Sequence, residues 1–225
     1  MHIIMPTSMK MRCVSCFGKT EGKKYIAAAL QLQGDENNLT TLAAIQGEGW
    51  AVIGYDSRVT EDNRIFVLPK DAGKVVKNGA YIFGAAGDMR AVNLLAHTFK
   101  PPVPTATDYG VKLDKFISSK LVPALKQCFD DAQYGEKGEQ DSSVLVVVHG
   151  RIYEIGGGYD WALDESGLYA MGSGAEYALG SMHTAFEGKK RTIGTARSVV
   201  KAAVGISARL DPSTGEPIYV ISQSG

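Results

Sequence analysis

Two adjacent threonines, Thr40 and Thr41, begin an apolar stretch that ends in an Asp-Ser-Arg turn at residues 56–58. A threonine hydroxyl is a poor nucleophile unless a base lies within hydrogen-bond reach. The α-amine of a first residue has a pKa of about 7.7–8.0, which suits proton transfer near neutral pH. Thr40 could therefore be a nucleophile, with its own amine as base, once the residues before it are removed. Taken alone, Thr40 and Thr41 are more simply two strand threonines followed by a solvated turn.

The chemistry of such a nucleophile requires further groups. A carboxylate and a lysine nearby can hold the amine and tune both groups, and a backbone N–H must face the developing oxyanion. The chain has an aspartate in the turn at residues 56–58, a lysine at the start of the strand predicted over 74–76, and a small-residue run at residues 84–87. Taken alone, these are a turn carboxylate, a solvated strand end and packing glycines.

The elements that must position these residues follow from hydrophobic periodicity and turn signals. Apolar runs predict a hairpin of strands 41–45 and 50–55, and further strands at 64–67, 74–76, 80–84, 142–148, 151–155, 168–171 and 217–222. Helical spacing predicts helices from Asp88 to about 98, over 108–131 with a kink at Pro123, and over 176–186 and 192–210. Strands and helix pairs in separate blocks predict an α+β fold of antiparallel sheets covered by helices.

Composition excludes several classes of protein. The 225 residues carry 24 basic and 24 acidic side chains, so the chain lacks the charge of a nucleic-acid binder. No apolar run approaches the roughly 20 residues of a membrane span, and the start is too short for a signal peptide. Three cysteines fit a reducing compartment, and a cytoplasmic protein is expected. The pair Cys13 and Cys16 lacks further ligands nearby, so no metal or cofactor is expected.

Six short motifs, in order and at similar spacing, resemble those of proteasome β-type subunits and HslV-like peptidases. They are Thr40-Thr41-Leu42, residues 56–60, Lys74-Val75, residues 84–87, residues 172–178 and residues 211–215. The resemblance covers residues 40–225. It implies the N-terminal-nucleophile (Ntn) hydrolase superfamily and its fold, a four-layer αββα sandwich of two antiparallel sheets covered by helix pairs.

The resemblance also implies roles for individual residues. Thr40 would be the nucleophile and its freed amine the general base. Asp56 would orient the amine and pair with Lys74, while Gly87 would donate the oxyanion N–H. The remaining expected roles are support of the amine by Ser173 and Asp211, main-chain hydrogen bonds to a peptide from Thr60 and Gly87, and a roomy apolar pocket lined by Val59, Ala72, Ala85 and Met89. Arg58 is expected to be structural.

By this resemblance the chain is a threonine endopeptidase that acts on peptides or unfolded proteins. Ring-forming copies of itself or of related subunits, and an AAA+ unfoldase, are its implied partners. Two alternatives remain open: a non-catalytic shell subunit in which Thr40 stays internal, and an amidase of the same superfamily.

Two departures from the family pattern concern the chain's start and the position of Lys74. Residues 1–39 form an extension without periodicity, and Leu39 stands where family precursors carry glycine. The extension is therefore either a propeptide cut before Thr40 or a misassigned start, with Leu39 encoded by an initiating TTG codon. The stretch from Asp56 to Lys74 is slightly longer than is usual in the family, so Lys74 rests on the Lys-Val match.

Overall fold

The computed structural model describes residues 40–61, 64–135 and 142–225. All of them lie in one compact unit, Asn37–Gly225. The expected extension over residues 1–39, including the Cys13 and Cys16 pair and Leu39, lies outside the described residues. Within the described part of the chain, no helix has the length and apolar character needed to cross a bilayer.

The first sheet has four antiparallel strands in the order β10-β1-β2-β11. Its central hairpin joins β1 and β2 through a turn at Gly49, whose φ of 70° suits glycine. Closing this hairpin brings the beginning of β1 beside the end of β2. The strand bounds are Leu42–Gly47 for β1, Trp50–Asp56 for β2, Leu168–Met171 for β10 and Ile218–Ser224 for β11.

The second sheet has five antiparallel strands in the order β5-β6-β7-β8-β9. A separate two-stranded ribbon, β3 paired with β4, follows directly on β2. The sheet strands are β5 (Val75–Asn78), β6 (Tyr81–Gly87), β7 (Ser142–Val148), β8 (Arg151–Ile155) and β9 (Trp161–Ala162), and the ribbon strands are β3 (Arg58–Glu61) and β4 (Arg64–Val67).

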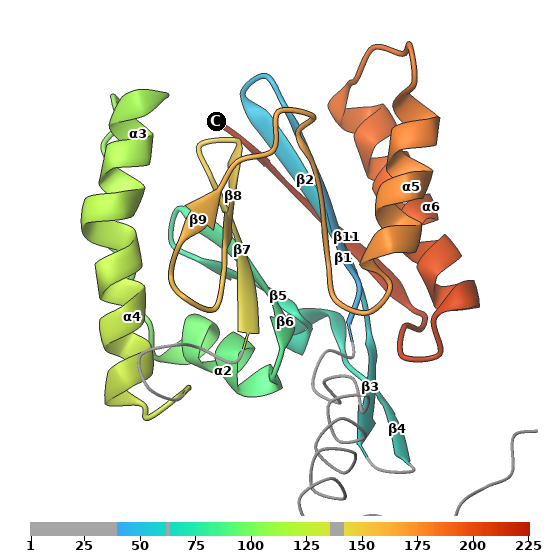
Figure 1. The fold of residues 1–225 in the computed structure, drawn as a ribbon, viewed down its shortest axis with the longest axis horizontal. Helices are drawn as coiled ribbons and strands as arrows, with labels where there is room; N and C mark the ends of the chain where they lie inside the picture. The colour runs from blue at the N-terminus through green and yellow to red at the C-terminus, as the bar shows by residue number, and fades with distance from the viewer. Residues whose placement is uncertain (1–39, 62–63, 136–141) are drawn as a thin grey trace, which may run out of the picture. The chain divides into compact units, whose positions relative to one another are not determined.

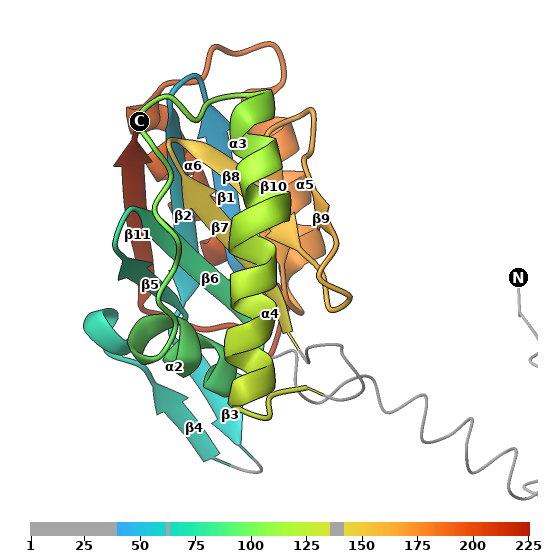
Figure 2. The ribbon, with the colours of Figure 1, turned by 90° about the vertical axis from the view of Figure 1, so that its left-hand side faces the viewer.

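Helices cover the outer face of each sheet, as Figures 1 and 2 show. On the second sheet lie α2 (Met89–His97), α3 (Val111–Phe116), the π-helical segment η3 (Ile117–Leu121) and α4 (Val122–Asp131). On the first sheet lie α5 (Ala175–Phe186) and α6 (Ile193–Leu210). The four-layer αββα sandwich is therefore confirmed.

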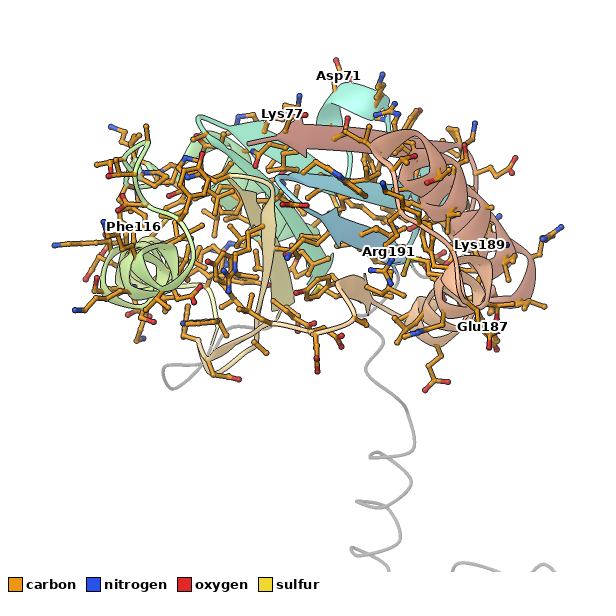
Figure 3. The ribbon with its side chains drawn as sticks, turned by 90° about the horizontal axis from the view of Figure 1, so that it is seen from above. Asp71, Lys77, Phe116, Glu187, Lys189 and Arg191 are labelled. Carbon is orange, nitrogen blue, oxygen red and sulfur yellow. The ribbon has the colours of Figure 1, made fainter. Side chains whose placement is uncertain are left out.

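Three apolar layers hold the sandwich together, and Figure 3 shows the side chains that fill them. One lies between α2–α4 and the second sheet, one between the two sheets, and one between the first sheet and α5–α6. The charged side chains of Asp71, Lys77 and Glu187 project outward from these layers. The middle layer is the one that brings the ends of the two sheets together.

The structure corrects three details of the sequence prediction. The helix expected over 108–131 begins at Val111, after Gly110 with a φ of 54°, and η3 interrupts it immediately before Pro123. Pro123 has no N–H and its ring crowds the carbonyl four residues earlier, which accounts for the irregular turn there. Strand β3 was not predicted, because its polar residues lack an apolar alternation.

Candidate active site

The start of β1 lies beside the end of β2 on one side and the end of β10 on the other. Leu42 is paired with Tyr55 on one side and with Met171 on the other, so Thr41 lies between Asp56 and Gly172. The N–H of Asp56 donates to the carbonyl of Thr41 at 3.3 Å. Thr40 and Thr41 are both buried. Strand pairing alone therefore brings three of the sequence motifs together.

The carboxylate of Asp56 is fully buried and accepts four hydrogen bonds. Its Oδ1 accepts from Lys74 Nζ at 2.7 Å and from Thr41 N at 2.9 Å. Its Oδ2 accepts from the backbone N–H groups of Arg58 and Gly215, each at 3.0 Å. These four donors fix the orientation of the carboxylate. The donor from this part of the chain is Thr41 N, one residue beyond the Thr40 amine that the resemblance predicts Asp56 to orient.

Lys74 comes from the other sheet, directly before β5, and its side chain is 1 % exposed. Burial lowers the pKa of Lys74, and the neighbouring Asp56 carboxylate acts in the opposite direction. A buried ion pair of this kind is costly to disrupt, since removal of one partner leaves an uncompensated charge. The expected Asp56–Lys74 pair is therefore present, in spite of the longer stretch between the two residues.

A second group of side chains lies on the other side of the threonines. Ser173 Oγ donates to Asp211 Oδ2 at 2.6 Å, and it lies 3.5 Å from the carbonyl oxygen of Thr40. Asp211 ends α6, and its Oδ1 accepts from Ser213 N at 3.1 Å. The structure thus places the predicted Ser173–Asp211 pair against the backbone of Thr40.

Sequence reasoning missed Thr214 in this group. Its hydroxyl donates to Asp211 Oδ2 and lies 2.6 Å from Thr41 Oγ1, so it bridges the end of α6 and the start of β1. The motif at residues 211–215 was recognised, but only the folded chain brings Thr214 to Thr41.

Two glycines allow the strands to approach this closely. Gly172 has a φ of 90°, and a Cβ on it would lie 1.9 Å from the carbonyl oxygen of Thr40. A Cβ on Gly174 would lie 2.1 Å from Thr41 Oγ1. The Gly-Ser-Gly run at residues 172–174 therefore positions Ser173 and leaves room for both threonines.

Gly87 ends β6 with a φ of 125°. The N–H of Ala85 donates to the carbonyl of Lys74 at 3.3 Å. Because N–H groups alternate along a strand, that of Gly87 points to the same side, beyond the beginning of β5. This direction suits the oxyanion donor predicted for it.

The predicted pocket and peptide-binding residues are spread over β3, β6, α2 and a 3-10 turn. Val59 and Thr60 are half-buried on β3, where they pair with Phe66 and Ile65 of β4. Ala85 is buried in the layer beneath α2, and Met89 packs against that layer. Ala72 is exposed in a short 3-10 helix, η2 (Lys70–Ala72). Only Ala85 and Met89 share one of the packed layers.

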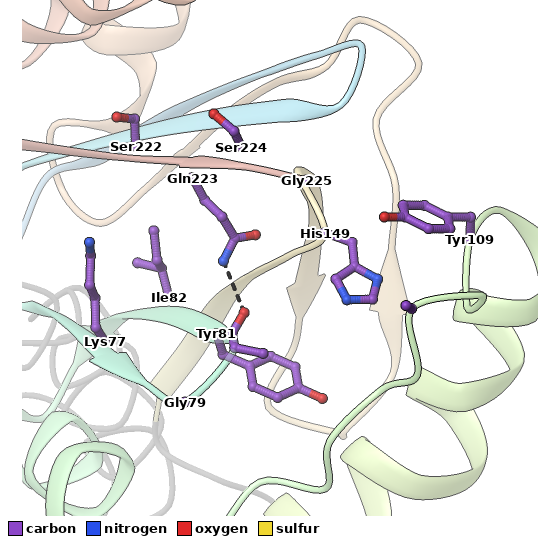
Figure 4. A pocket seen from close by; sticks show the side chains of 12 residues that line it. Lys77, Gly79, Tyr81, Ile82, Tyr109, His149, Ser222, Gln223, Ser224 and Gly225 are labelled. Atoms are coloured by element: carbon purple, nitrogen blue, oxygen red, sulfur yellow. Dashed lines mark hydrogen bonds between the residues drawn. The ribbon is translucent and has the colours of Figure 1, made fainter.

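Among the described residues, no three His, Cys, Asp or Glu side chains are grouped so as to hold a metal ion. A cavity of about 410 Å³ lies at the other end of the strands, lined by Tyr81 at the start of β6 and by Tyr109, His149 and Gln223 (Figure 4). Tyr81 and Gly87 stand at opposite ends of β6, so this cavity is separate from the threonine site.

Solved structures share this architecture. BPH from Thiobacillus denitrificans, in complex with epoxomicin, matches with a TM-score of 0.66 and 18 % identity, covering 82 % of this chain and 98 % of that chain. HslV from Trypanosoma brucei matches with a TM-score of 0.57 and 20 % identity, covering 83 % of this chain and 100 % of that chain. The chain has the proteasome-like Ntn-hydrolase fold. At these identities the similarity establishes the fold alone. No family model and no curated protein sequence matches the chain.

Proposed function

We propose that residues 40–225 form a threonine-type endopeptidase subunit whose nucleophile is Thr40, freed as the first residue. The observation that carries this proposal is the position of Thr40 between a buried ion pair and a partly buried hydroxyl–carboxylate pair. On one side the Asp56 carboxylate, which is paired with Lys74, accepts from the N–H of the adjacent Thr41. On the other side Ser173, which donates to Asp211, lies against the carbonyl of Thr40. A buried ion pair and a hydroxyl–carboxylate pair around one strand end are more than β1 needs to form.

The proposed reaction uses the α-amine of Thr40 as base and as acid in turn. The α-amine of Thr40 takes the proton from Oγ1 as that oxygen attacks the peptide carbonyl, and the Gly87 N–H stabilises the oxyanion. The amine then gives the proton to the leaving nitrogen, the C–N bond breaks, and an ester to Thr40 remains. Water, deprotonated by the same amine, then attacks the ester carbonyl; the bond to Oγ1 breaks, the carboxylic acid product leaves, and the amine returns the proton to Oγ1. The charge of Lys74 favours deprotonation of the Thr40 hydroxyl, and Asp56 holds that charge in place.

Substrate would bind as an added strand. Among the described residues β3 pairs only with β4, so the edge of β3 that carries Thr60 is available for main-chain hydrogen bonds to an extended peptide. Val59, Ala72, Ala85 and Met89 would then form an uncharged pocket, and apolar side chains are expected before the cleaved bond. A fluorogenic peptide panel tests this, and a clear preference for acidic or basic residues there would overturn it.

The working form is proposed to be a ring of copies or related subunits in the cytoplasm, served by an AAA+ unfoldase. The support is the similarity in fold to HslV together with the expected self-association of the fold. Native mass spectrometry of the purified protein checks the ring, and a stable monomer that cleaves peptides at full rate would contradict it.

The full chain, expressed from its own gene, tests the central claim. Intact mass should give an active species that begins at Thr40, and a peptide epoxyketone should add its mass at Thr40. Thr40→Ala should abolish peptide cleavage, by more than about a thousandfold, because both nucleophile and adduct site are lost. Active protein that still begins at Met1, or a correctly processed Thr40→Ala protein as fast as its parent, would refute the proposal. The non-catalytic shell alternative predicts an inactive protein that still begins at Met1.

A further inference from the structure

Tyr55, next to Asp56 on β2, holds the turn that leads into Lys74. Its hydroxyl donates to the carbonyl of Lys70 at 3.2 Å. Its ring lies against Gly73, where a Cβ would be only 2.6 Å from the Tyr55 ring. The ring is fully buried in the layer between the two sheets. Tyr55 therefore reaches from the first sheet to the segment that enters β5 in the second.

The chain just before Lys74 needs such support. It consists of the short η2 turn, whose preceding residue Pro69 makes no side-chain cap. The carbonyl of Lys74 accepts from Ala85 N, which fixes Lys74 to β6 on one side. At the other end of the segment, Leu68 N donates to the carbonyl of Ser57 at 2.8 Å. Residues 68–73 are thus tied to the continuation of β2 at one end and to Tyr55 at the other.

The two neighbours on β2 therefore act on one lysine in different ways. Asp56 binds the ammonium group of Lys74, and Tyr55 fixes the backbone that precedes it. A restraint on this backbone matters because each residue between Asp56 and Lys74 adds conformational freedom.

We propose that Tyr55 is a positioning residue that sets the place of Lys74 relative to Asp56. This inference rests on the proposed function for its consequence in catalysis, but its effect on Lys74 does not. The charged groups that face Lys74 are Asp56, Asp211 and Arg58, and Tyr55 contributes no charge of its own at neutral pH.

Tyr55→Phe tests the proposal, because it removes the hydrogen bond to Lys70 and keeps the ring. The matched control is Tyr81→Phe, since Tyr81 is equally buried and donates to the carbonyl of Pro102 at 2.6 Å, far from Lys74. Gly73→Ala disturbs the same contact from the other side, and its extended backbone (φ −88°, ψ −169°) accepts alanine.

The first measurement is the pKa of the Lys74 side chain by NMR, with its signal assigned by its loss in Lys74→Arg. Tyr55→Phe and Gly73→Ala should raise this pKa towards its ordinary value, because a looser turn lets water reach the ammonium group. Tyr81→Phe should leave it unchanged. An unchanged Lys74 pKa in both turn variants would overturn the proposal, whatever the activity of the protein.

The second measurement is peptide cleavage per epoxyketone-titrated site. Tyr55→Phe should lower kcat about three- to tenfold with KM unchanged, the size expected from one neutral hydrogen bond. Tyr81→Phe should keep the parent kcat even if it lowers stability. Equal kcat in Tyr55→Phe and the parent would overturn the catalytic part. A parent that neither cleaves peptides nor labels at Thr40 refutes the proposed function instead, and the Lys74 titration still decides the role of Tyr55.

Discussion

The hydroxyl of Ser57 differs from the polar groups around it. Asp56 beside it has four donors, and the backbone of Ser57 donates to Gly215 and accepts from Leu68. Yet the side chain is fully buried, and its Oγ has no hydrogen-bond partner among the described residues. A buried hydroxyl without a partner costs roughly 1–3 kcal/mol of desolvation free energy. Its presence does not stabilise the folded state.

Ser57→Ala should therefore leave the free energy of unfolding unchanged or raise it by up to about 1 kcal/mol. Urea unfolding measures this. The matched control is Ser142→Ala, because Ser142 Oγ accepts from Asp88 N at 3.1 Å and bonds Tyr134 Oη at 2.6 Å. That variant should lose about 1–3 kcal/mol. Equal losses in the two variants would contradict the argument.

Thr214 offers a second test at this scale, since its hydroxyl joins Asp211 to Thr41. Thr214→Val keeps the shape and removes both hydrogen bonds, so the free energy of unfolding should fall by about 1–3 kcal/mol. Thr214→Ser keeps the hydroxyl and should recover most of that loss. If valine and serine gave the same urea midpoint, the hydroxyl would have no structural role.

At the scale of elements, Gly172 must remain a glycine, whereas Gly180 can accept a side chain. Gly172 joins β10 to α5 with a positive φ and lies against the carbonyl of Thr40. Gly180 lies inside α5, and a Cβ on it would meet nothing within 4 Å. Gly180→Ala should raise the free energy of unfolding by about 0.5–1 kcal/mol. Gly172→Ala should lower it by several times that amount and separate Ser173 from Thr40. Thermal unfolding of both variants checks this, and a neutral Gly172→Ala would disprove the contact.

Elements with strong periodicity were predictable from the sequence. The β1–β2 and β7–β8 hairpins were predicted because apolar runs flank Gly-containing turns. Helix α2 was predicted from Asp88 as its cap, and in the structure the Asp88 side chain accepts from the N–H of Arg90. The break in the long helix was only half predicted. Its buried residues recur at every fourth position, whereas an α-helix turns once in 3.6 residues, so the wider turn of η3 keeps them on one face. These residues are Leu113, Ile117, Leu121, Leu125 and Phe129.

Site residues were predictable where a sequence motif identifies them, and were not predictable where only a tertiary contact gives the residue its role. Asp56, Lys74, Ser173 and Asp211 were named from sequence, and the structure brings them together in pairs. Thr214 and Tyr55 were not, since a threonine or tyrosine near a strand end is common. Their roles depend on partners that only the folded chain brings close, such as Thr41 for Thr214 and the Lys70–Gly73 turn for Tyr55.

At the scale of the whole molecule, buried tyrosines make stability sensitive to alkaline pH. Burial raises the pKa of Tyr55 and of Tyr159 to about 12, and it also raises the pKa values of Tyr81, Tyr153 and Tyr169. A folded pKa above the unfolded value gives stability that is present below pH 10 and is lost as the pH rises through the folded pKa. Lys74, with its lowered pKa, acts in the opposite direction but is a single group.

The urea midpoint of the protein should therefore fall steeply between pH 10 and about pH 12. Tyrosine ionisation, monitored by absorbance, should occur together with the loss of structure and not before it. An unchanged midpoint at pH 11 would show that these tyrosines ionise freely in the folded protein.

The Asp56–Lys74 ion pair spans two sheets that meet through an apolar layer. Leu42 and Ile53 from one sheet and Val75 from the other crowd the backbone of Gly84 in that layer, within 3.0–3.3 Å of where a Cβ would stand. Repacking there would move one sheet against the other and stretch an ion pair that no substitution had touched. Efforts to make this protein more heat-resistant by enlarging its interior should therefore begin beneath α5 and α6, where added volume leaves that ion pair in place.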